Sequence, residues 1–436
     1  MSVQSIGLIG MGVLVLMIFL RVPVAISMGL VGLCGYAAVA GWDRAVRVLG
    51  QVPFDVASGY DLSVVPMFVL MGELATRSGM SAKLYNAARA FFVGFRGAQA
   101  LATLGACAAF GAVCGSSLAT AATMTRIAIP QMRRLGYDDR LSTGAVAAGG
   151  SLGILIPPSI PLVIYAIIAE QSVAKLFAAG MIPGLVLTAL YMLMVVAVLI
   201  WKPGWAPTDP GMSWRERFAA LGSIWSIAIL FGVAIGGLYA GWFTPTEAAA
   251  IGAFGAWGLG ALGRGLSLKQ TWAAFTDTIR TTCMLFMIVI CAVIFSYFVV
   301  QTQLPDLLVS WMRTIELGPV GLMLIIIAFY VVMGCFLDGF GMILITVPVF
   351  LPLIVQSGWD PIWFGVILVV VIELGLIHPP VGMNIFVIQA QVPDVPVLKI
   401  YQGIIPFLVA PFLLLGLLLA FPDIALWLPQ TLFPPR

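Results

Sequence analysis

Two proline pairs stand inside long apolar stretches, each with a glycine four residues before it: residues 153–159 (GILIPPS) and 375–382 (GLIHPPVG). Proline lacks an amide hydrogen and its ring obstructs the preceding helical turn, so each pair interrupts a helix and frees backbone carbonyl groups. Within a membrane these carbonyls must meet protein, water or an ion, because lipid cannot satisfy them. Such breaks offer oxygen ligands for Na⁺ and helix N-termini for a carboxylate. The alternative is a pair of proline kinks with a structural role alone.

Polar residues stand where two helical hairpins are expected to turn. The hydroxyl groups of Ser116, Ser117 and Thr120 lie near the first turn. They are candidate ion ligands, although hydroxyls in membrane helices more often bond to the backbone one turn earlier. Asp338 lies in the second turn, where it would neutralise a cation, cap a half-helix, or do both.

His378 is the single histidine of the chain, so it cannot belong to a cluster of histidine metal ligands. It is a candidate proton carrier or hydrogen-bond donor to a solute, and the alternative is a buried histidine with a partner inside the protein. Asn384 lies about one turn beyond the second break. It would either contact the solute or join two helices by a hydrogen bond.

The composition places these residues in a membrane protein. The 436 residues are 61% hydrophobic and 9% charged, with a mean hydropathy of +1.10, whereas soluble domains carry about 25% charged residues. The net charge of +3 is modest and its basic residues are scattered without aromatic interleaving, which argues against nucleic acid as a partner. The six cysteines lie in apolar segments and are expected to be packing residues.

Apolar runs long enough to cross a bilayer recur along the chain. We expect crossings near residues 4–20, 22–40, 61–76, 142–168, 176–201, 221–240, 246–263, 281–300, 361–388 and 403–421. With both termini outside, this topology puts 16 of the 21 lysines and arginines in the cytoplasm, as the positive-inside rule requires. The sequence therefore predicts an all-α polytopic inner-membrane protein with about ten transmembrane helices.

That topology requires the stretch between Arg96 and Arg126 to enter the membrane and return on the same side. From Ala102 to Thr125, 17 of 24 residues are Gly, Ala, Ser or Thr, which suits close helix packing inside protein and not a lipid-facing surface. We predict a re-entrant hairpin over residues 98–125, and a second one over residues 319–356, because Asp338 at that depth must be buried and paired.

The chain contains an internal repeat. Shifting it by 222 positions aligns Pro23 with Pro245 and, further along, six more identical residues; the six pairs are Pro130/Pro352, Gly136/Gly358, Asp138/Asp360, Gly153/Gly375, Pro157/Pro379 and Pro158/Pro380. The predicted topology makes the two halves inverted, which is the architecture of secondary transporters that bind solute near the midplane. We expect one membrane unit over residues 1–436, with scaffold and transport parts interleaved. Repeat 1 covers about 1–201 with its broken helix at 142–168, and repeat 2 covers about 221–422 with its broken helix at 361–388.

Two further motifs favour structural roles. Residues 244–247 (TPTE) form the pattern of a capping box with proline at the first helical position. Glu73 stands near a predicted helix end, where membrane anchoring or a scaffold contact is favoured over ion binding.

Seven motifs, in order along the chain, resemble those of the large membrane subunit of tripartite (TRAP-type) transporters, the DctM type. They are residues 21–25 (RVPVA), 66–74 (PMFVLMGEL), 115–121 (GSSLATA), 155–161 (LIPPSIP), 176–184 (LFAAGMIPG), 243–250 (FTPTEAAA) and 378–384 (HPPVGMN). The resemblance implies an elevator-type carrier, Na⁺-coupled uptake of a small carboxylate, a separate small four-helix membrane subunit (DctQ-like), and a periplasmic solute receptor (DctP-like). It implies no cofactor other than Na⁺ as coupling ion.

The resemblance also implies where Na⁺ binds, and residues near the breaks and hairpin turns are the expected solute contacts. The expected Na⁺ ligands are Gly115, Ser116, Ser117, Gly153, Pro157, Asp338, Gly339, Gly375 and Pro379. The expected solute contacts are Thr120, Pro158, Ser159, Gly341, His378, Pro380 and Asn384. Many relatives have threonine where this chain has His378, which leaves room for a different solute or a protonation step.

Other function classes were weighed against this one. A receptor-independent ion-coupled carrier or antiporter of the same superfamily is the main alternative. An intramembrane serine hydrolase built from Ser116 or Ser117 with His378 is disfavoured, because two prolines follow the histidine directly and no GxSG motif is present. A purely structural scaffold would have little use for two broken helices. We therefore expect a carrier and not an enzyme.

Overall fold

The computed structural model of the chain describes residues 2–207, 211–263, 265–307, 310, 318–334, 337 and 339–434. Within these ranges the chain forms helices and no β-strand, and five helices are long and apolar enough to cross a membrane. Five shorter apolar helices accompany them. The expected all-helical class is confirmed, while the number of crossings stays a prediction.

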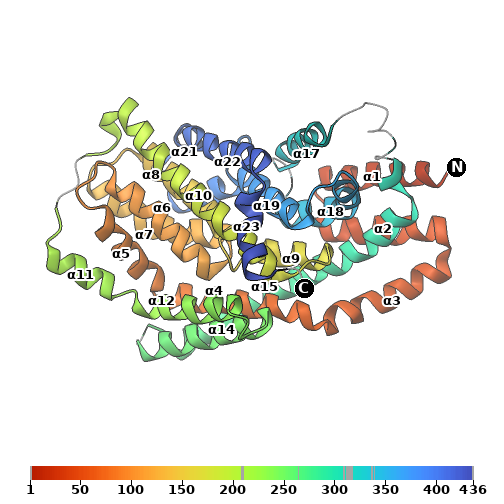
Figure 1. The fold of residues 1–436 in the computed structure, drawn as a ribbon, viewed down its shortest axis with the longest axis horizontal. Coiled ribbons are helices and arrows are strands. Elements are labelled where there is room, and N and C mark those ends of the chain that lie inside the picture. The colour runs from red at the N-terminus through yellow and green to blue at the C-terminus, as the bar shows by residue number, and fades with distance from the viewer. Residues whose placement is uncertain are drawn as a thin grey trace.

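The chain begins with helices α1 to α14, most of which are labelled in Figure 1. They are α1 (Val3–Phe19), α2 (Val24–Ala40), α3 (Trp42–Ser58), α4 (Val64–Arg77), α5 (Met80–Phe92), α6 (Ala98–Cys114), α7 (Ser117–Arg134), α8 (Asp139–Ser151), α9 (Ile160–Ile168), α10 (Val173–Trp201), α11 (Trp214–Gly222), α12 (Trp225–Phe231), α13 (Gly237–Tyr239) and α14 (Pro245–Leu262).

The second half continues with a long helix and ends in a series of shorter ones. They are α15 (Leu268–Gln301), α17 (Pro319–Gly334), α18 (Gly339–Gln356), α19 (Pro361–Ile377), α20 (Met383–Gln391), α21 (Val397–Ile404), α22 (Val409–Ala420) and α23 (Asp423–Leu432). The predicted capping box at the start of α14 is confirmed, since Thr244 and Glu247 each accept a hydrogen bond from the other's backbone N–H.

Several helices are absent from the predicted crossings or differ from them. Helices α3 and α5 were not anticipated, because their mixture of charged and apolar residues does not resemble a membrane span. The crossing predicted to begin at residue 281 belongs to α15, which begins at Leu268. Its first turns are polar, and they form a helix because Ser267 and Gln270 make a capping box there.

Each predicted hairpin region folds as two helices whose outer ends are tied together. In the first region, Gln99 N near the start of α6 donates to the hydroxyl of Tyr137, just beyond α7, at 3.2 Å. In the second, Trp359 Nε1 just beyond α18 donates to Pro319 O at the start of α17, also at 3.2 Å. Tyr137 and Trp359 are 222 positions apart, so the same position closes both hairpins.

The sequence repeat has matching local structure in both halves. Gly136 and Gly358 both have φ of +81°, a left-handed conformation that favours glycine. Two residues later, the side chain of Asp138 caps α8 by accepting one backbone hydrogen bond, and that of Asp360 caps α19 by accepting two. The two Pro–Pro peptide bonds are both cis. The offset of 222 therefore describes equivalent turns, caps and breaks.

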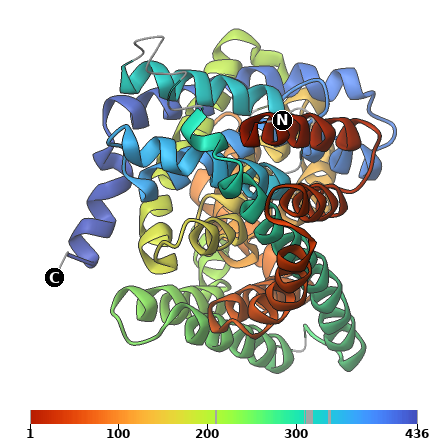
Figure 2. The same cartoon turned by 90° about the vertical axis from the view of Figure 1, so that its right-hand side faces the viewer.

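The helices divide into two packed groups. Helix α15 packs along α2 and α4, and α4 packs against α14; in Figure 1 α3 and α14 follow the lower edge of the molecule, and Figure 2 shows the red N-terminal helices beside the green-blue α15. The second group joins α6, α7 and α8 to α20 and α21, with α18 on α19 and α9. Contacts of α4 with α6 and α9, and of α15 with α18, connect the groups.

The tied ends of the first hairpin generate a labelling prediction. Arg96→Cys and Arg134→Cys, placed singly in a cysteine-free background, should both react with a membrane-impermeant maleimide from the same side of the membrane. Glu170→Cys, in the exposed turn after α9, should react from the other side. Labelling of positions 96 and 134 from opposite sides would contradict the re-entrant arrangement.

Candidate functional site

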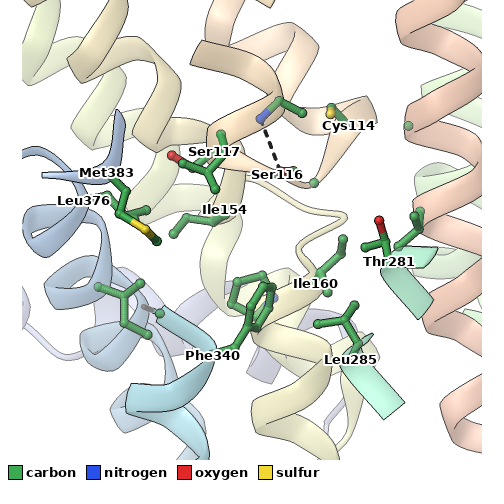
Figure 3. Close-up of a pocket in the computed structure, with 18 of the residues that line it drawn as sticks. Cys114, Ser116, Ser117, Ile154, Ile160, Thr281, Leu285, Phe340, Leu376 and Met383 are labelled. Atoms are coloured by element: carbon green, nitrogen blue, oxygen red, sulfur yellow. Dashed lines mark hydrogen bonds between the residues drawn. The ribbon is translucent and has the colours of Figure 1, made fainter. Parts of the chain in front are cut away.

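A cavity of about 420 Å³ lies where the first hairpin turns and the broken helices meet (Figure 3). Its walls come from elements that are distant in sequence. The tip of the first hairpin supplies Cys114 to Ala119, and the two breaks supply Ile154, Ile160, Leu376 and Met383, with Gly339 and Phe340 from α18. Helices α4 and α15 form the opposite wall with Gly72, Glu73, Thr281 and Leu285.

Four helix N-termini line this cavity. The lining includes first-turn residues of α7 (Ser117), α9 (Ile160), α18 (Gly339) and α20 (Met383). The first backbone N–H groups of a helix lack partners within the helix, and its dipole puts partial positive charge at that end. The described lining contains no lysine, arginine or histidine, and Glu73 is its one acidic residue. Within this lining, the groups with positive partial charge are therefore backbone N–H groups at helix N-termini and not basic side chains.

Glycine allows each hairpin to pack directly against the backbone of a helix break. A Cβ on Gly111 of α6 would lie 2.5 Å from the Cα of Gly153. A Cβ on Gly375 would lie 2.9 Å from the Cα of Gly334 of α17. Separations under 3 Å are not tolerated between such atoms, so glycine is required at these contacts. The hairpins thereby cover backbone that the prolines leave without helical partners.

The polar residues at the first tip have partners inside the protein. Ser116 caps α7 by accepting from Ala119 N at 3.4 Å, and the Thr120 hydroxyl donates to Ser116 O at 2.7 Å. Ser117 and Asn384, both buried, are joined by side-chain contacts of 2.8 and 3.0 Å. This pair connects the tip of repeat 1 to the helix that follows the break of repeat 2.

The breaks are held by side chains close to them. The Ser159 hydroxyl donates to Ile154 O and accepts from Leu162 N, so it bridges the first break and caps α9. Beyond the second break, Tyr401 donates to Pro380 O at 2.5 Å and to Val381 O at 3.1 Å. His378 ends α19, and its Nδ1 contacts Pro379 O.

The structure gathers part of the predicted site at the cavity. Gly115, Ser116, Ser117 and Gly339 line it, whereas Asp338 lies outside the described residues. The remaining predicted positions are not in the described lining; they are Thr120, Gly153, Pro157, Pro158, Ser159, Gly341, Gly375, His378, Pro379, Pro380 and Asn384. The Thr120 hydroxyl bonds to the backbone one turn earlier, and Asn384 joins two helices; both were the structural alternatives to a role in binding.

Two acidic residues of this region are not among the predicted site residues. Glu73 accepts from Arg77 Nε at 3.3 Å, and Arg77 also pairs with Asp277 of α15; the spacing of four residues on one helix was the available signal. Glu373 of α19 is fully buried, and its carboxylate oxygens have no hydrogen-bond partner among the described residues. An acidic residue inside an apolar crossing was the signal there.

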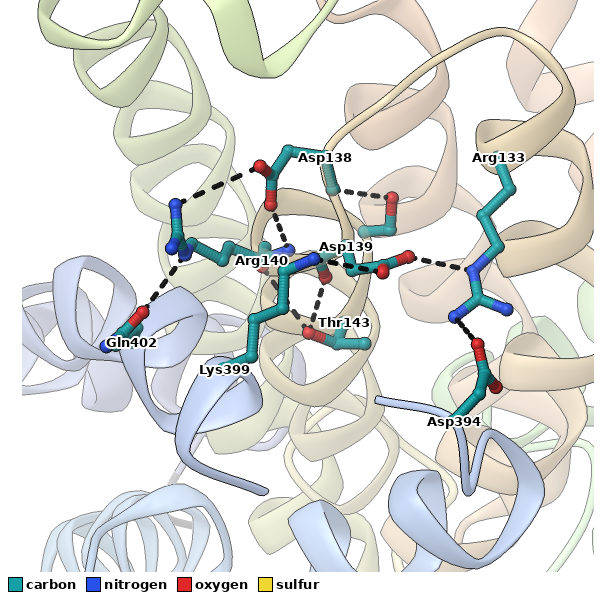
Figure 4. A network of polar contacts seen from close by, with 9 residues as sticks. Arg133, Asp138, Asp139, Arg140, Thr143, Asp394, Lys399 and Gln402 are labelled. Carbon is teal, nitrogen blue, oxygen red and sulfur yellow. Dashed lines mark hydrogen bonds and ion pairs between the residues drawn. The ribbon is translucent and has the colours of Figure 1, made fainter. Parts of the chain in front are cut away.

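An ion-pair network joins the two repeats at the base of the first hairpin (Figure 4). Arg133 Nε and Lys399 Nζ donate to Asp139, at 2.8 and 3.2 Å, and Arg133 Nη2 donates to Asp394 at 2.7 Å. Asp139 lies outside the predicted crossing 142–168. Desolvation raises the pKa of Asp139, but the hydrogen bonds and charges of Arg133 and Lys399 outweigh it, so the pKa lies below its ordinary value.

The long apolar helices define the class as a polytopic membrane protein. The structure superposes on the YdaH transporter of Alcanivorax borkumensis with a TM-score of 0.65 over 88% of this chain and 90% of that one, at 16% identity. Residues 11–424 match the family described as tripartite ATP-independent periplasmic transporter, DctM component. The chain therefore belongs to this family, and the resemblance seen in its motifs is confirmed.

Named relatives agree with this assignment. The C4-dicarboxylate TRAP transporter large permease protein DctM of Pseudomonas aeruginosa is 36% identical, with 89% of this chain and 90% of that protein aligned. The sialic acid TRAP transporter large permease protein SiaM of Vibrio cholerae is 33% identical, with 88% and 89% aligned. The chain is thus a multi-pass membrane protein of a transporter family, as its sequence predicted.

The network at the hairpin base predicts an acid-sensitive contribution to stability. Asp139→Asn should lower the unfolding free energy at pH 7 by about 1–2 kcal/mol, because the carboxylate has two cationic partners. A lowered pKa means that this contribution is present above about pH 4, the unfolded-state value, and is lost as the pH falls through the folded-state value. Thermal unfolding midpoints of the two proteins should therefore converge below pH 4. Asp394→Asn removes one exposed ion pair and should have a smaller effect. If the midpoints of Asp139→Asn and the unmodified protein differed by the same amount at all pH values, the stabilisation would not come from the Asp139 carboxylate.

The Ser117–Asn384 pair predicts energetic coupling between the repeats. Ser117→Ala or Asn384→Ala should each cost about 1–3 kcal/mol of stability, because the other side chain is left buried without its partner. The double variant should cost less than the sum of the two single changes. Thr188→Ala, whose hydroxyl bonds within α10 at 2.8 Å, should instead add to Asn384→Ala. Equal additivity in both combinations would exclude the coupling.

Proposed function

We propose that this chain is the large membrane subunit of a transporter that imports a small organic acid across the bacterial inner membrane, driven by a Na⁺ gradient. A periplasmic receptor delivers the solute, and a small four-helix membrane subunit completes the assembly. Both termini face the periplasm. The family name, which describes a tripartite periplasmic transporter, supports the two partners, and the carboxylate-bearing solutes named for two relatives support the solute class.

One observation carries the proposal: four helix N-termini converge on a cavity whose described lining has no basic side chain. A carboxylate in this cavity would accept hydrogen bonds from first-turn N–H groups. Co-bound Na⁺ would add the positive charge that side chains do not supply. Glu73 does not oppose this, because it is paired with Arg77 at 3.3 Å.

The contacts between hairpins and breaks suggest where Na⁺ binds. In repeat 1 the carbonyl of Ser116 and the hydroxyl of Thr120 lie within 3 Å of where a Cβ on Gly153 would be. Backbone oxygens at Gly115, Gly153 and Pro157, with the Ser116 and Ser117 hydroxyls, are the candidate ligands. In repeat 2 the equivalent set is Asp338, Gly339, Gly375 and Pro379. Oxygen ligands of this kind suit a hard cation.

The two packed groups suggest an elevator mechanism. The cavity lies between them, with α4 and α15 on one side and the tips and breaks on the other. The Arg77–Asp277 pair fastens α4 to α15, while Ser117–Asn384 and the Asp139 network fasten the hairpins to the broken helices. Each group is therefore linked internally by polar contacts, and the motion would occur between them.

Uptake measurements test the coupling ion. Proteoliposomes containing the large and small subunits, with receptor outside, should accumulate a labelled carboxylate only with an inward Na⁺ gradient. Ser116→Ala should raise the half-saturating Na⁺ concentration by about tenfold, the equivalent of one lost ligand worth ~1.4 kcal/mol. Ser223→Ala, which removes a hydroxyl on a distant helix end, should leave it unchanged. Uptake that is indifferent to Na⁺ would refute the proposal, and uptake without receptor would favour the self-sufficient carrier.

A further inference from the structure

An apolar groove on the side of the molecule leads to a cluster of arginines. The groove encloses about 670 Å³ between α5, α6, α10 and the start of α12. Gly105 and Ala109 of α6 form a floor of small residues, and Phe92, Leu193 and Val196 are among the walls. Leu193 is 63% exposed, so the groove is open to the surface that the surrounding lipid contacts.

The arginines gather where α5 ends and α11 begins. Arg217 Nη2 donates to Val93 O at 3.3 Å, and Val93 follows the groove residue Phe92 in the chain. Arg89 lies three residues before Phe92 on the same helix and interacts electrostatically with Glu216. The Nε atoms of Arg89 and Arg217 are buried and have no hydrogen-bond partner among the described residues.

The charge around this end of the groove is unbalanced. Arg96 donates to Pro203 O and to Ala206 O, which draws the end of α10 to the same place. The segments that meet here are residues 89–96, 202–207 and 211–217. They carry five basic residues and one acidic residue, which are Arg89, Arg96, Lys202, Arg215, Arg217 and Glu216. Most of these residues lie on the predicted cytoplasmic side, where anionic lipids attract basic side chains.

A buried guanidinium nitrogen without an acceptor is costly, and an open apolar groove within the bilayer fills with hydrocarbon. One molecule can satisfy both features: a phospholipid whose phosphate accepts from the arginines while an acyl chain occupies the groove. An apolar protein helix would fill the groove but would leave the Nε atoms of Arg89 and Arg217 without acceptors. An inorganic anion would pair with the arginines but would leave the groove empty.

We propose that the groove between α5, α6 and α10 is a binding site for an anionic phospholipid, with its phosphate held by Arg89 and Arg217. The groove and the cavity share no lining residue, so this lipid site does not depend on the proposed transport function.

Native mass spectrometry and thermal unfolding of the full-length chain in detergent test this site, with phosphatidylglycerol and phosphatidylcholine as probes. Phosphatidylglycerol should remain bound and raise the unfolding midpoint more than phosphatidylcholine does. Its retention should fall about fivefold for each of Arg89→Gln and Arg217→Gln, consistent with ~1 kcal/mol per basic residue near the headgroups. Arg215→Gln, which changes an exposed arginine of α11, is the matched control and should lower the retention less than either of these changes.

A second variant separates lipid binding from folding. Ala109→Phe fills the groove from an exposed position and leaves both arginines in place, so it should abolish the advantage of phosphatidylglycerol without lowering the midpoint in lipid-free detergent. Equal effects of the two lipids on the unmodified chain would overturn the proposal. So would an equal effect of inorganic phosphate, which would indicate an anion site, or loss of the lipid when the small subunit binds, which would indicate a protein interface.

Discussion

The structure depends on one constraint: backbone polar groups that lipid cannot hydrogen-bond must be covered by protein. A helix interrupted by two prolines in the middle of an apolar segment exposes carbonyl groups that hydrocarbon cannot satisfy. The chain meets this requirement twice by placing a hairpin on each break, with glycine facing glycine at Gly111–Gly153 and Gly334–Gly375. Substituting any of these glycines would separate a hairpin from the break that it covers.

The same requirement produces the cavity. Because each hairpin turns beside a break, the new helices that begin there have their N-termini close together, and the cavity collects first turns from both repeats. The two halves are not chemically identical around it. Repeat 1 contributes hydroxyl groups, and Ser117 reaches across to Asn384 of repeat 2. That contact attaches the hairpin tip of repeat 1 to the broken helix of repeat 2.

Much of this arrangement could be predicted from the sequence, because proline and glycine act locally. The offset of 222 aligned Gly136 with Gly358 and one proline pair with the other. In the structure both glycines are left-handed and both Pro–Pro bonds are cis. Side-chain partners depend on packing between distant segments and were less accessible. Thr120 and Asn384 were candidates for solute contact, yet they bond to Ser116 and Ser117. For Glu73 the sequence favours membrane anchoring or a scaffold contact over ion binding. Its place in the cavity lining could not be predicted, because nothing in the sequence indicates that α4 faces the breaks.

The most direct test is a cryo-electron microscopy map of the chain with its small subunit, prepared in Na⁺ with a transported carboxylate. We expect solute density between the first turns of α7, α9, α18 and α20, with ion density beside Gly153 and Gly375. Solute density elsewhere, such as the crevice of about 320 Å³ between α9, α15 and α18, with nothing bound at the hairpin turns, would contradict it.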